Sequence, residues 1–252
     1  MNAKYYEINR NGLNIRCKYY FEKGETVRRA VITGTGFGGH KDNKAVERYA
    51  EHVLKKHKDT AVVAFNWPCH GDDVKKKMAL ADCDAYLDSV IKDAAEKFPE
   101  AELYGYATSF GGYLFLKFIH DHGDPFRKAA LRCPAVNMYD VLTKAIIRND
   151  EMDRLSKGKE VPVGFDRKIM VSPAFLDELL SEDIRAYDYL DYAEDLLILH
   201  GTKDEIVPFT DSQEFAEASL IEFIPVQNAD HRFQDPKTMD EAIKRIQEFF
   251  GW

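Results

Sequence analysis

Short apolar runs alternate with segments of helical periodicity along most of the chain, and this rhythm constrains the fold more than any other feature. Residues 60–65, for example, form a β-branched apolar run that is typical of a strand buried on both faces. Because repeated strand–helix units give a parallel sheet with helices on both faces, the sequence predicts an α/β fold. The predicted strands are residues 30–33, 60–65, 101–106, 129–133, 196–199 and 221–226, and the predicted helices are residues 42–56, 78–98, 113–119, 212–218 and 236–250.

The N-terminal segment predicts a β-hairpin. Residues 5–8 and 13–21 have strand character, and Asn11-Gly12 between them suits a tight primed turn. We expect this hairpin at one edge of the sheet, which brings the mostly parallel sheet to about eight strands.

The 252 residues are sufficient for one domain with a sizeable core. The rhythm breaks over residues 135–193, which contain helical stretches at residues 138–149 and 174–180. Such a connection is longer than ordinary loops between strands. We therefore expect a core of residues 1–134 and 194–252, with residues 135–193 inserted as a cap over the carboxyl edge of the sheet, where ligands bind in such folds. A peripheral insertion remote from the site is the alternative.

Ser109 lies at a predicted strand-to-helix corner, with Ala107 two residues before it and Gly111 two residues after it. A nucleophile elbow needs this arrangement, because the strained turn brings the helix and the neighbouring strands too close for large side chains. A tight turn with an idle serine is the competing interpretation. The corner makes Ser109 the candidate nucleophile.

Two further residues follow predicted strands at the same edge of the sheet. Asp204 comes after residues 196–199, and His231 comes after residues 221–226. The order Ser, Asp, His is the chain order that accompanies this type of elbow. His231 would take the serine proton and pass it to the leaving group, and Asp204 would orient the imidazole and stabilise its charged form. Taken singly, Asp204 could cap a helix and His231 could face solvent.

A glycine-rich loop, residues 34–39, follows the first parallel strand. Its backbone can approach a substrate closely, so the backbone N–H groups of Phe37 and Phe110 are the candidate oxyanion hole. A phosphate-binding loop is the alternative, but the Lys-Ser/Thr pair of a P-loop is missing from this segment.

Over nearly its whole length the chain resembles the α/β-hydrolase superfamily, and within it the capped esterases of the cinnamoyl/feruloyl type. The resemblance lies in residues 35–42, similar to the oxyanion loop of these enzymes, in residues 65–72, similar to the loop after their fourth strand, in the corner at Ser109, and in residues 200–208. It implies the α/β-hydrolase fold and a Ser-His-Asp triad. These motifs are specific for the superfamily and the triad, and not for a substrate.

The chain departs from the pattern of that family at three positions. Thr35 stands where these esterases usually have His, Ala107 replaces the first elbow glycine, and Cys69 stands where Gly is common. The extra methyl group of Ala107 puts the position of Ser109 in question, and Cys69 does the same for its local turn. We interpret His40 and His70 as structural rather than catalytic residues.

The candidate substrate contacts are Gly36, His40, Met138 and Tyr139. Large apolar residues in the expected cap stand singly among charged ones, unlike the broad apolar face of a lipase lid. A small or medium soluble ester is therefore the expected substrate, and a hydroxycinnamoyl ester is implied by the resemblance alone. Packing of the same apolar residues on the core is the alternative. They are Met138, Tyr139, Ile146, Ile147, Phe165, Met170 and Phe175.

The formal net charge of −8 argues against nucleic acid or an anionic membrane surface as a partner. The N-terminal residues lack the apolar segment of a signal peptide, and no run is long enough to span a bilayer, so we expect a cytoplasmic protein. The four cysteines are not paired as in a metal or redox site. We expect no metal and no organic cofactor, and a homodimer is left open.

Three functions fit these observations. The leading hypothesis is a serine carboxylester hydrolase that works through an acyl-enzyme. A thioesterase or a peptidase could use the same triad, because attack and oxyanion binding do not select the leaving group. A weakly catalytic binding protein with this fold is the third, because a fold does not by itself establish an activity.

Overall fold

The computed structural model describes residues 1–164 and 168–252. Phe165, one of the apolar residues expected in the cap, lies outside the described residues. In the described ranges, no helix is both long and apolar enough to cross a membrane.

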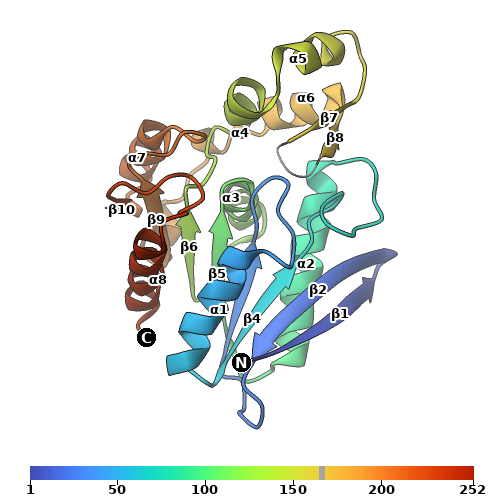
Figure 1. Cartoon of the computed structure of the whole chain (residues 1–252). Helices are drawn as coiled ribbons and strands as arrows, with labels where there is room; N and C mark the ends of the chain where they lie inside the picture. The colour runs from blue at the N-terminus through green and yellow to red at the C-terminus, as the bar shows by residue number, and fades with distance from the viewer. Residues whose placement is uncertain (165–167) are drawn as a thin grey trace.

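The predicted eight-stranded sheet is confirmed, with the strand order β1-β2-β4-β3-β5-β6-β9-β10 (Figure 1). The hairpin β1–β2 lies at one edge and is antiparallel, and Asn11 (φ 50°) and Gly12 (φ 76°) form its turn, as a primed turn requires. All pairs from β4 to β10 are parallel. The strands are β1 (Asn2–Arg10), β2 (Leu13–Phe21), β3 (Arg29–Gly34), β4 (Thr60–Phe65), β5 (Glu102–Thr108), β6 (Lys128–Arg132), β9 (Leu196–Gly201) and β10 (Glu222–Val226).

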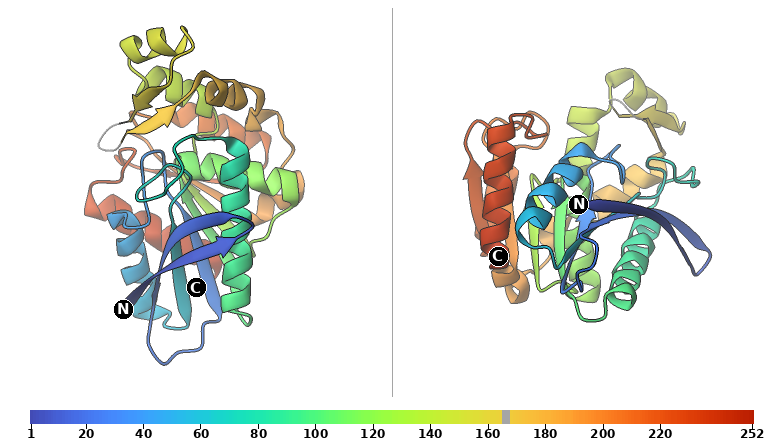
Figure 2. Two further views of the ribbon diagram at one scale, coloured as in Figure 1. Left: turned by 90° about the vertical axis from the view of Figure 1, so that its right-hand side faces the viewer. Right: turned by 60° about the horizontal axis from the view of Figure 1, so that its bottom comes forward.

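Helices cover both faces of the sheet (Figures 1 and 2). Helices α1 and α8 pack on one face, and α2 and α3 pack on the other. Two separate hydrophobic clusters result, one on each side of the sheet, because side chains alternate between the faces of a strand. The helices of these layers are α1 (Lys44–Lys56), α2 (Leu80–Lys97), α3 (Phe110–His122), α7 (Phe209–Ala218) and α8 (Pro236–Phe250).

The chain leaves the sheet after β6, and residues 138–163 and 169–181 lie beyond the carboxyl ends of the parallel strands (Figure 1), before residues 184–195 lead back to the start of β9. The predicted helix over residues 138–149 is wrong in its extent, because the chain becomes extended at Ile147 (ψ 130°) and a new helix then begins, where Oε2 of Glu151 accepts a hydrogen bond from the N–H of Arg148 (3.0 Å). A two-stranded sheet was not predicted. The elements are α4 (Met138–Asp140), the π-helix η1 (Val141–Ile146), α5 (Asn149–Leu155), β7 (Val161–Val163), β8 (Ile169–Val171), α6 (Pro173–Ser181) and the 3₁₀ helices η2 (Ile184–Ala186) and η3 (Leu190–Asp195).

Helix α3 approaches the end of β3 so closely that only glycine fits at the contact. A Cβ atom on Gly111 would lie 2.5 Å from the carbonyl oxygen of Gly34. Backbone atoms of a central strand cannot move aside as a flexible side chain can. Gly111 therefore sets the distance between the first turn of α3 and the sheet.

We predict that Gly111→Ala lowers the free energy of unfolding by about 3 kcal/mol, because the methyl group must push α3 off the strand. Gly158→Ala is the matched control, since Gly158 has open space around its Cα and only its φ of +76° is unfavourable. That control should lose about 1 kcal/mol. Urea unfolding of both variants measures the difference, and equal losses would contradict the close contact.

Candidate active site

Ser109 connects β5 to α3 in a strained backbone conformation, with φ 53° and ψ −119°. A non-glycine residue adopts this region only where the surroundings enforce it. Here the Ser109 N–H donates to the carbonyl of Arg132 (3.1 Å), and its carbonyl accepts from the N–H groups of Tyr113 and Ala135 (both 3.1 Å). These bonds present the side chain at the edge of the sheet, where Ser109 is 8% exposed.

The structure accommodates Ala107 through its neighbour on β3. Ala107 pairs with Gly34 in the sheet, and a Cβ on Gly34 would lie 3.2 Å from the methyl group of Ala107. Gly34 thus supplies the space that a glycine at position 107 would otherwise provide. The methyl group is fully buried in the core.

Asp204 and His231 meet as the sequence predicts. The imidazole Nδ1 of His231 lies 2.7 Å from Oδ2 of Asp204, whose side chain is fully buried. Because a carboxylate only accepts hydrogen bonds, Nδ1 carries the proton and the neutral ring keeps Nε2 as its basic atom. This is the tautomer that a general base requires.

Backbone contacts between two loops fix this pair. The N–H groups of Thr202 and Lys203 donate to the carbonyls of Val226 and Ala229, both at 3.0 Å. A Cβ on Gly201 would lie only 2.3 Å from the Ala229 oxygen, so the loops approach as closely as backbones can. The loop that carries Asp204 and the loop that carries His231 therefore form one rigid unit.

A second histidine contacts the same carboxylate. Nε2 of His200, at the end of β9, lies 3.2 Å from Oδ2 of Asp204 and 3.2 Å from the carbonyl of Val207. The other oxygen of Asp204 accepts from the N–H groups of Ile206 (2.9 Å) and Val207 (2.8 Å). Burial alone would raise the pKa of Asp204, but hydrogen bonds from His200 and His231 outweigh it and hold this pKa well below the ordinary range.

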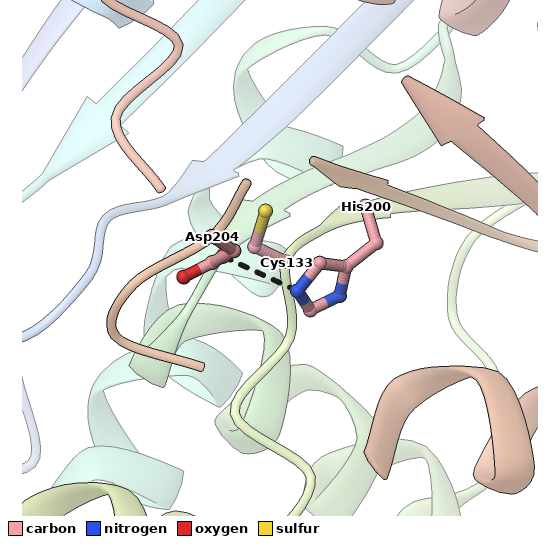
Figure 3. A group of neighbouring side chains, drawn as sticks. All are labelled: Cys133, His200 and Asp204. Atoms are coloured by element: carbon pink, nitrogen blue, oxygen red, sulfur yellow. Dashed lines mark ion pairs between the residues drawn. The ribbon is translucent and has the colours of Figure 1, made fainter. Parts of the chain in front are cut away.

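Cys133, His200 and Asp204 converge closely enough that three ligand atoms could face one metal ion (Figure 3). Metal binding would need the Cys133 thiolate, whereas burial raises the pKa of that thiol well above its ordinary value. The Asp204 carboxylate is also already held by both histidines and two backbone N–H groups. The cluster therefore fits a support for Asp204 better than a metal site.

The glycine-rich loop lies against the nucleophile. A Cβ on Gly36 would lie 3.1 Å from the Cβ of Ser109, so the loop backbone touches the candidate nucleophile. The rings of Phe37 and Phe110 contact each other edge to face with centroids 5.9 Å apart. Phe110 is the first residue of α3, and its N–H has no acceptor inside the helix. The two candidate oxyanion donors thus belong to adjoining segments beside Ser109.

The loop after β4 is joined to the glycine-rich loop and the residues that follow it by two hydrogen bonds. Trp67 Nε1 donates to the carbonyl of Thr35 (2.9 Å), and Oδ1 of Asn66 accepts from the N–H of Lys41 (2.8 Å). His70 stacks on Phe110, and burial lowers the pKa of this imidazole to about 4. His70 is therefore neutral at physiological pH. Cys69 has a φ of 67°, so the turn keeps the left-handed shape that glycine would favour.

Ser109, Gly36, Phe37, His40 and His231 line one cavity of about 950 Å³. In the described part of the chain, no hydrogen bond joins the Ser109 hydroxyl to His231. Contacts between nucleophile and base commonly tighten when substrate binds. The other lining residues are Gly38, Gly39, Asn43, Lys44, Ala45, Glu47, Arg48, Glu51, Thr108, Arg132, Ile146, Ile206, Arg232, Phe233, Gln234, Pro236 and Met239.

Met138 and Tyr139, the candidate substrate contacts from the insertion, do not line this cavity. Both residues line a separate cavity of about 140 Å³ with Tyr113 and Leu179, and Met138 is buried in the core. The insertion contributes Ile146 to the Ser109 cavity instead. Met138 lies in the first turn after the chain leaves the sheet, where its side chain fills the junction between insertion and core.

The sequence reasoning missed His200 and Arg132. His200 precedes Asp204 by four residues at the end of a strand, and this spacing could have signalled a contact. Arg132 is a charged residue at the end of an otherwise apolar run, which is unusual for a strand buried on both faces. Both lie at the carboxyl edge of the sheet.

Comparisons with known proteins agree with the fold. The model of the prolyl oligopeptidase family matches residues 65–252. Est1E from Butyrivibrio proteoclasticus with ferulic acid bound has a TM-score of 0.77 at 16% identity, over 98% of this chain and 100% of that one. A soluble variant of monoglyceride lipase from Saccharomyces cerevisiae, in complex with a substrate analog, has a TM-score of 0.75 at 14% identity, over 100% and 95% of the two chains. A search of curated protein sequences found no match.

The low pKa of Asp204 predicts how stability depends on pH. A carboxyl whose folded pKa lies below its unfolded value of about 4 stabilises the fold above that value, and this contribution is lost as the pH falls toward the folded pKa. Between about pH 5 and pH 2, the free energy of unfolding of the wild type should therefore fall more steeply than that of Asp204→Asn. Urea unfolding at a series of pH values measures both slopes, and parallel slopes would contradict the prediction.

Proposed function

The chain belongs to the prolyl oligopeptidase family of hydrolases, and on this premise we propose that it is a serine hydrolase that cleaves small or medium soluble carboxylic esters through an acyl-enzyme. The observation that carries the proposal is the 2.7 Å contact between Asp204 and His231 beside the cavity that Ser109 also lines. Family membership indicates hydrolysis, and the geometry supports the roles proposed for Ser109, Asp204 and His231.

The proposed reaction has two halves. Ser109 Oγ attacks the ester carbonyl carbon while Nε2 of His231 takes the hydroxyl proton, and the carbonyl electron pair moves onto oxygen. The tetrahedral intermediate then expels the alcohol, which receives the proton from His231. Water attacks the acyl-enzyme in the same way, and release of the acid restores Ser109. Asp204 stays ionised and stabilises the imidazolium in both halves.

The oxyanion is stabilised by backbone N–H groups in this proposal. Phe110 offers an N–H that has no acceptor inside the helix, at the start of α3, where the helix dipole also favours negative charge. Phe37 offers the second donor from the loop held by Trp67. Thr35 replaces the His of related esterases, but its carbonyl, and not its side chain, is what Trp67 holds. The substitution therefore leaves the support of the loop intact.

We propose that residues 135–193 act as a cap for this site. Residues 138–163 and 169–181 lie beyond the carboxyl edge of the sheet (Figure 1), and Ile146 lines the Ser109 cavity. A cavity that also contains charged side chains suits a soluble ester better than a lipid surface. Hydroxycinnamoyl esters belong to the proposed range, because the similar Est1E structure holds ferulic acid.

A peptidase is the second candidate, and the match to the prolyl oligopeptidase family is the observation that favours it. The same triad and oxyanion hole can cleave an amide when the leaving amine is protonated. A preference for amides over esters must then come from how the cavity holds the groups on either side of the reacting bond.

We predict that Ser109→Ala lowers kcat for p-nitrophenyl butyrate by about 10⁴-fold or more, because the nucleophile is lost. Ser181→Ala, an exposed serine at the end of α6, is the control and should keep wild-type activity. A fluorophosphonate probe should label the wild type at Ser109, as read by mass spectrometry. Equal turnover by the wild type and Ser109→Ala, or a purified chain that neither turns over substrate nor reacts with the probe, would contradict the proposal.

A leaving-group panel separates the candidates. We predict that p-nitrophenyl butyrate and methyl ferulate are cleaved with higher kcat/KM than a butyryl thioester or an Ala-Pro p-nitroanilide. The anilide should be slow because its leaving nitrogen needs a precisely placed proton donor, which an ester does not need. Steady-state rates with Ser109→Ala as blank provide the measurement. Faster cleavage of the prolyl anilide would move the assignment to a peptidase.

A further inference from the structure

Arg132 lies next to the candidate nucleophile but belongs to a different strand. It is the last residue of β6, it pairs with Thr108 in the sheet, and its carbonyl accepts the 3.1 Å hydrogen bond from the Ser109 N–H. Arg132 lines the cavity that contains Ser109, together with Phe233 and Met239, which its guanidinium contacts. Any ligand seated on the nucleophile therefore shares a cavity with this guanidinium.

The guanidinium of Arg132 is buried among side chains that do not neutralise it. The residue is 5% exposed, its Cζ lies 4.8 Å from the ring centre of Phe233, and Nη1 contacts the Met239 sulfur at 3.3 Å. Its Nε has no hydrogen-bond partner, and no ion pair to a carboxylate is found among residues 1–164 and 168–252. Neither a ring face nor a thioether replaces a carboxylate as the partner of a guanidinium.

A permanent charge in this position is unfavourable for folding. Arginine does not lose its proton in proteins, so Arg132 cannot escape the cost of burial by neutralisation. Buried charges are ordinarily paired, and an apolar side chain of similar size would pack here without that cost. A buried guanidinium with donors to spare, facing an active-site cavity, therefore indicates a partner that arrives with the ligand.

The charges around the cavity favour an anionic ligand. The chain as a whole is acidic, with a formal charge of −8. Among the residues that line the cavity, Lys44, Arg48, Arg132 and Arg232 are basic, and Glu47 and Glu51 are acidic. Arg48 is already bound by Asp240 at 2.7 Å. Arg132 is the buried member of this basic group, so its interaction with an anion is least weakened by water.

We propose that Arg132 is an anion receptor in the Ser109 cavity, and that the ligand of this cavity carries an anionic oxygen group, a carboxylate or a phosphate, apart from the bond that is cleaved. The planar guanidinium matches both groups through paired N–H donors. The part of this proposal that concerns the substrate rests on the proposed esterase function. The binding of an anion by Arg132 does not depend on that function.

The kinetic test compares esters that differ only in charge. Mono-p-nitrophenyl esters of succinate, glutarate and adipate place a carboxylate at increasing distances from the reacting carbonyl. Each has a neutral counterpart in which an isopropyl group replaces the carboxylate, for example p-nitrophenyl 4-methylpentanoate for the succinate ester. The ratio of kcat/KM within a pair measures how strongly the cavity selects the anion.

We expect the wild type to favour at least one charged ester over its neutral counterpart by about tenfold or more, and Arg132→Met to reduce that ratio to about one. Arg132→Lys, which keeps the charge without the planar fork, should give an intermediate ratio. Arg127→Met is the control, because Arg127 is exposed next to the opposite end of the same strand. It should retain the wild-type ratio. Ratios near one for every pair in the wild type, or an unchanged ratio in Arg132→Met, would overturn the proposal.

A binding measurement separates this proposal from the esterase assignment. Glutarate and inorganic phosphate are titrated calorimetrically into Ser109→Ala, and into the double variant Ser109→Ala/Arg132→Met. Binding of either anion that weakens about tenfold or more in the double variant supports the receptor even if no ester is cleaved. Binding of neither anion, or equal binding by both variants, overturns it even if neutral esters are cleaved.

Thermal unfolding distinguishes a role of Arg132 in ligand binding from a purely structural role. If Arg132 serves a ligand, Arg132→Met relieves a buried unpaired charge, and Tm stays equal or rises. If Arg132 instead holds the strand end and the Phe233 ring in place, Tm falls together with activity toward charged and neutral esters alike. That second result would overturn the proposal.

Discussion

The close approach of α3 to the end of β3 is the constraint on which the rest of the site depends. Gly111 allows this approach, and Gly34 makes room both for it and for Ala107. The strained φ of 53° at Ser109 follows, because the chain must turn from β5 into a helix that lies directly on the neighbouring strand. The side chain of Ser109 is thereby held at the edge where the carboxyl ends of the parallel strands converge.

The Asp204–His231 pair depends on a different interaction, the hydrogen bonds that protein groups donate to one buried carboxylate. Asp204 loses water on folding and receives four hydrogen bonds in return, two from histidines and two from backbone N–H groups. Those bonds favour the ionised form against burial. An ionised Asp204 fixes the proton of His231 on Nδ1, so the charge state of one buried group determines the basic atom that faces the cavity.

Local sequence rules predicted the sheet, the hairpin and the convergence of Asp204 with His231, since each depends on strand periodicity, turn chemistry or the common edge of parallel strands. The insertion followed these rules less well. The paired strands β7 and β8 have only three residues each, too few for an alternation to show, and the break at Ile147 depends on how the insertion packs, which periodicity does not encode. The same limit explains Met138, whose apolar side chain suits a substrate pocket and a core equally, and His200, whose contact with Asp204 appears only once the loop is folded.

Several departures from ordinary folding rules lie at the carboxyl edge of the sheet. Ser109, Cys133 and Phe233 all have positive φ, and all lie at the carboxyl edge of the sheet or in the loops beyond it. The unpaired buried atoms Nδ1 of His200 and Nε of Arg132 lie at the same edge. Selection for stability alone would remove strain and unpaired charge wherever they occur, because each is locally unfavourable. The surrounding sheet, with its fully buried strands β4 and β9, supplies stability that offsets the cost of these departures at its edge.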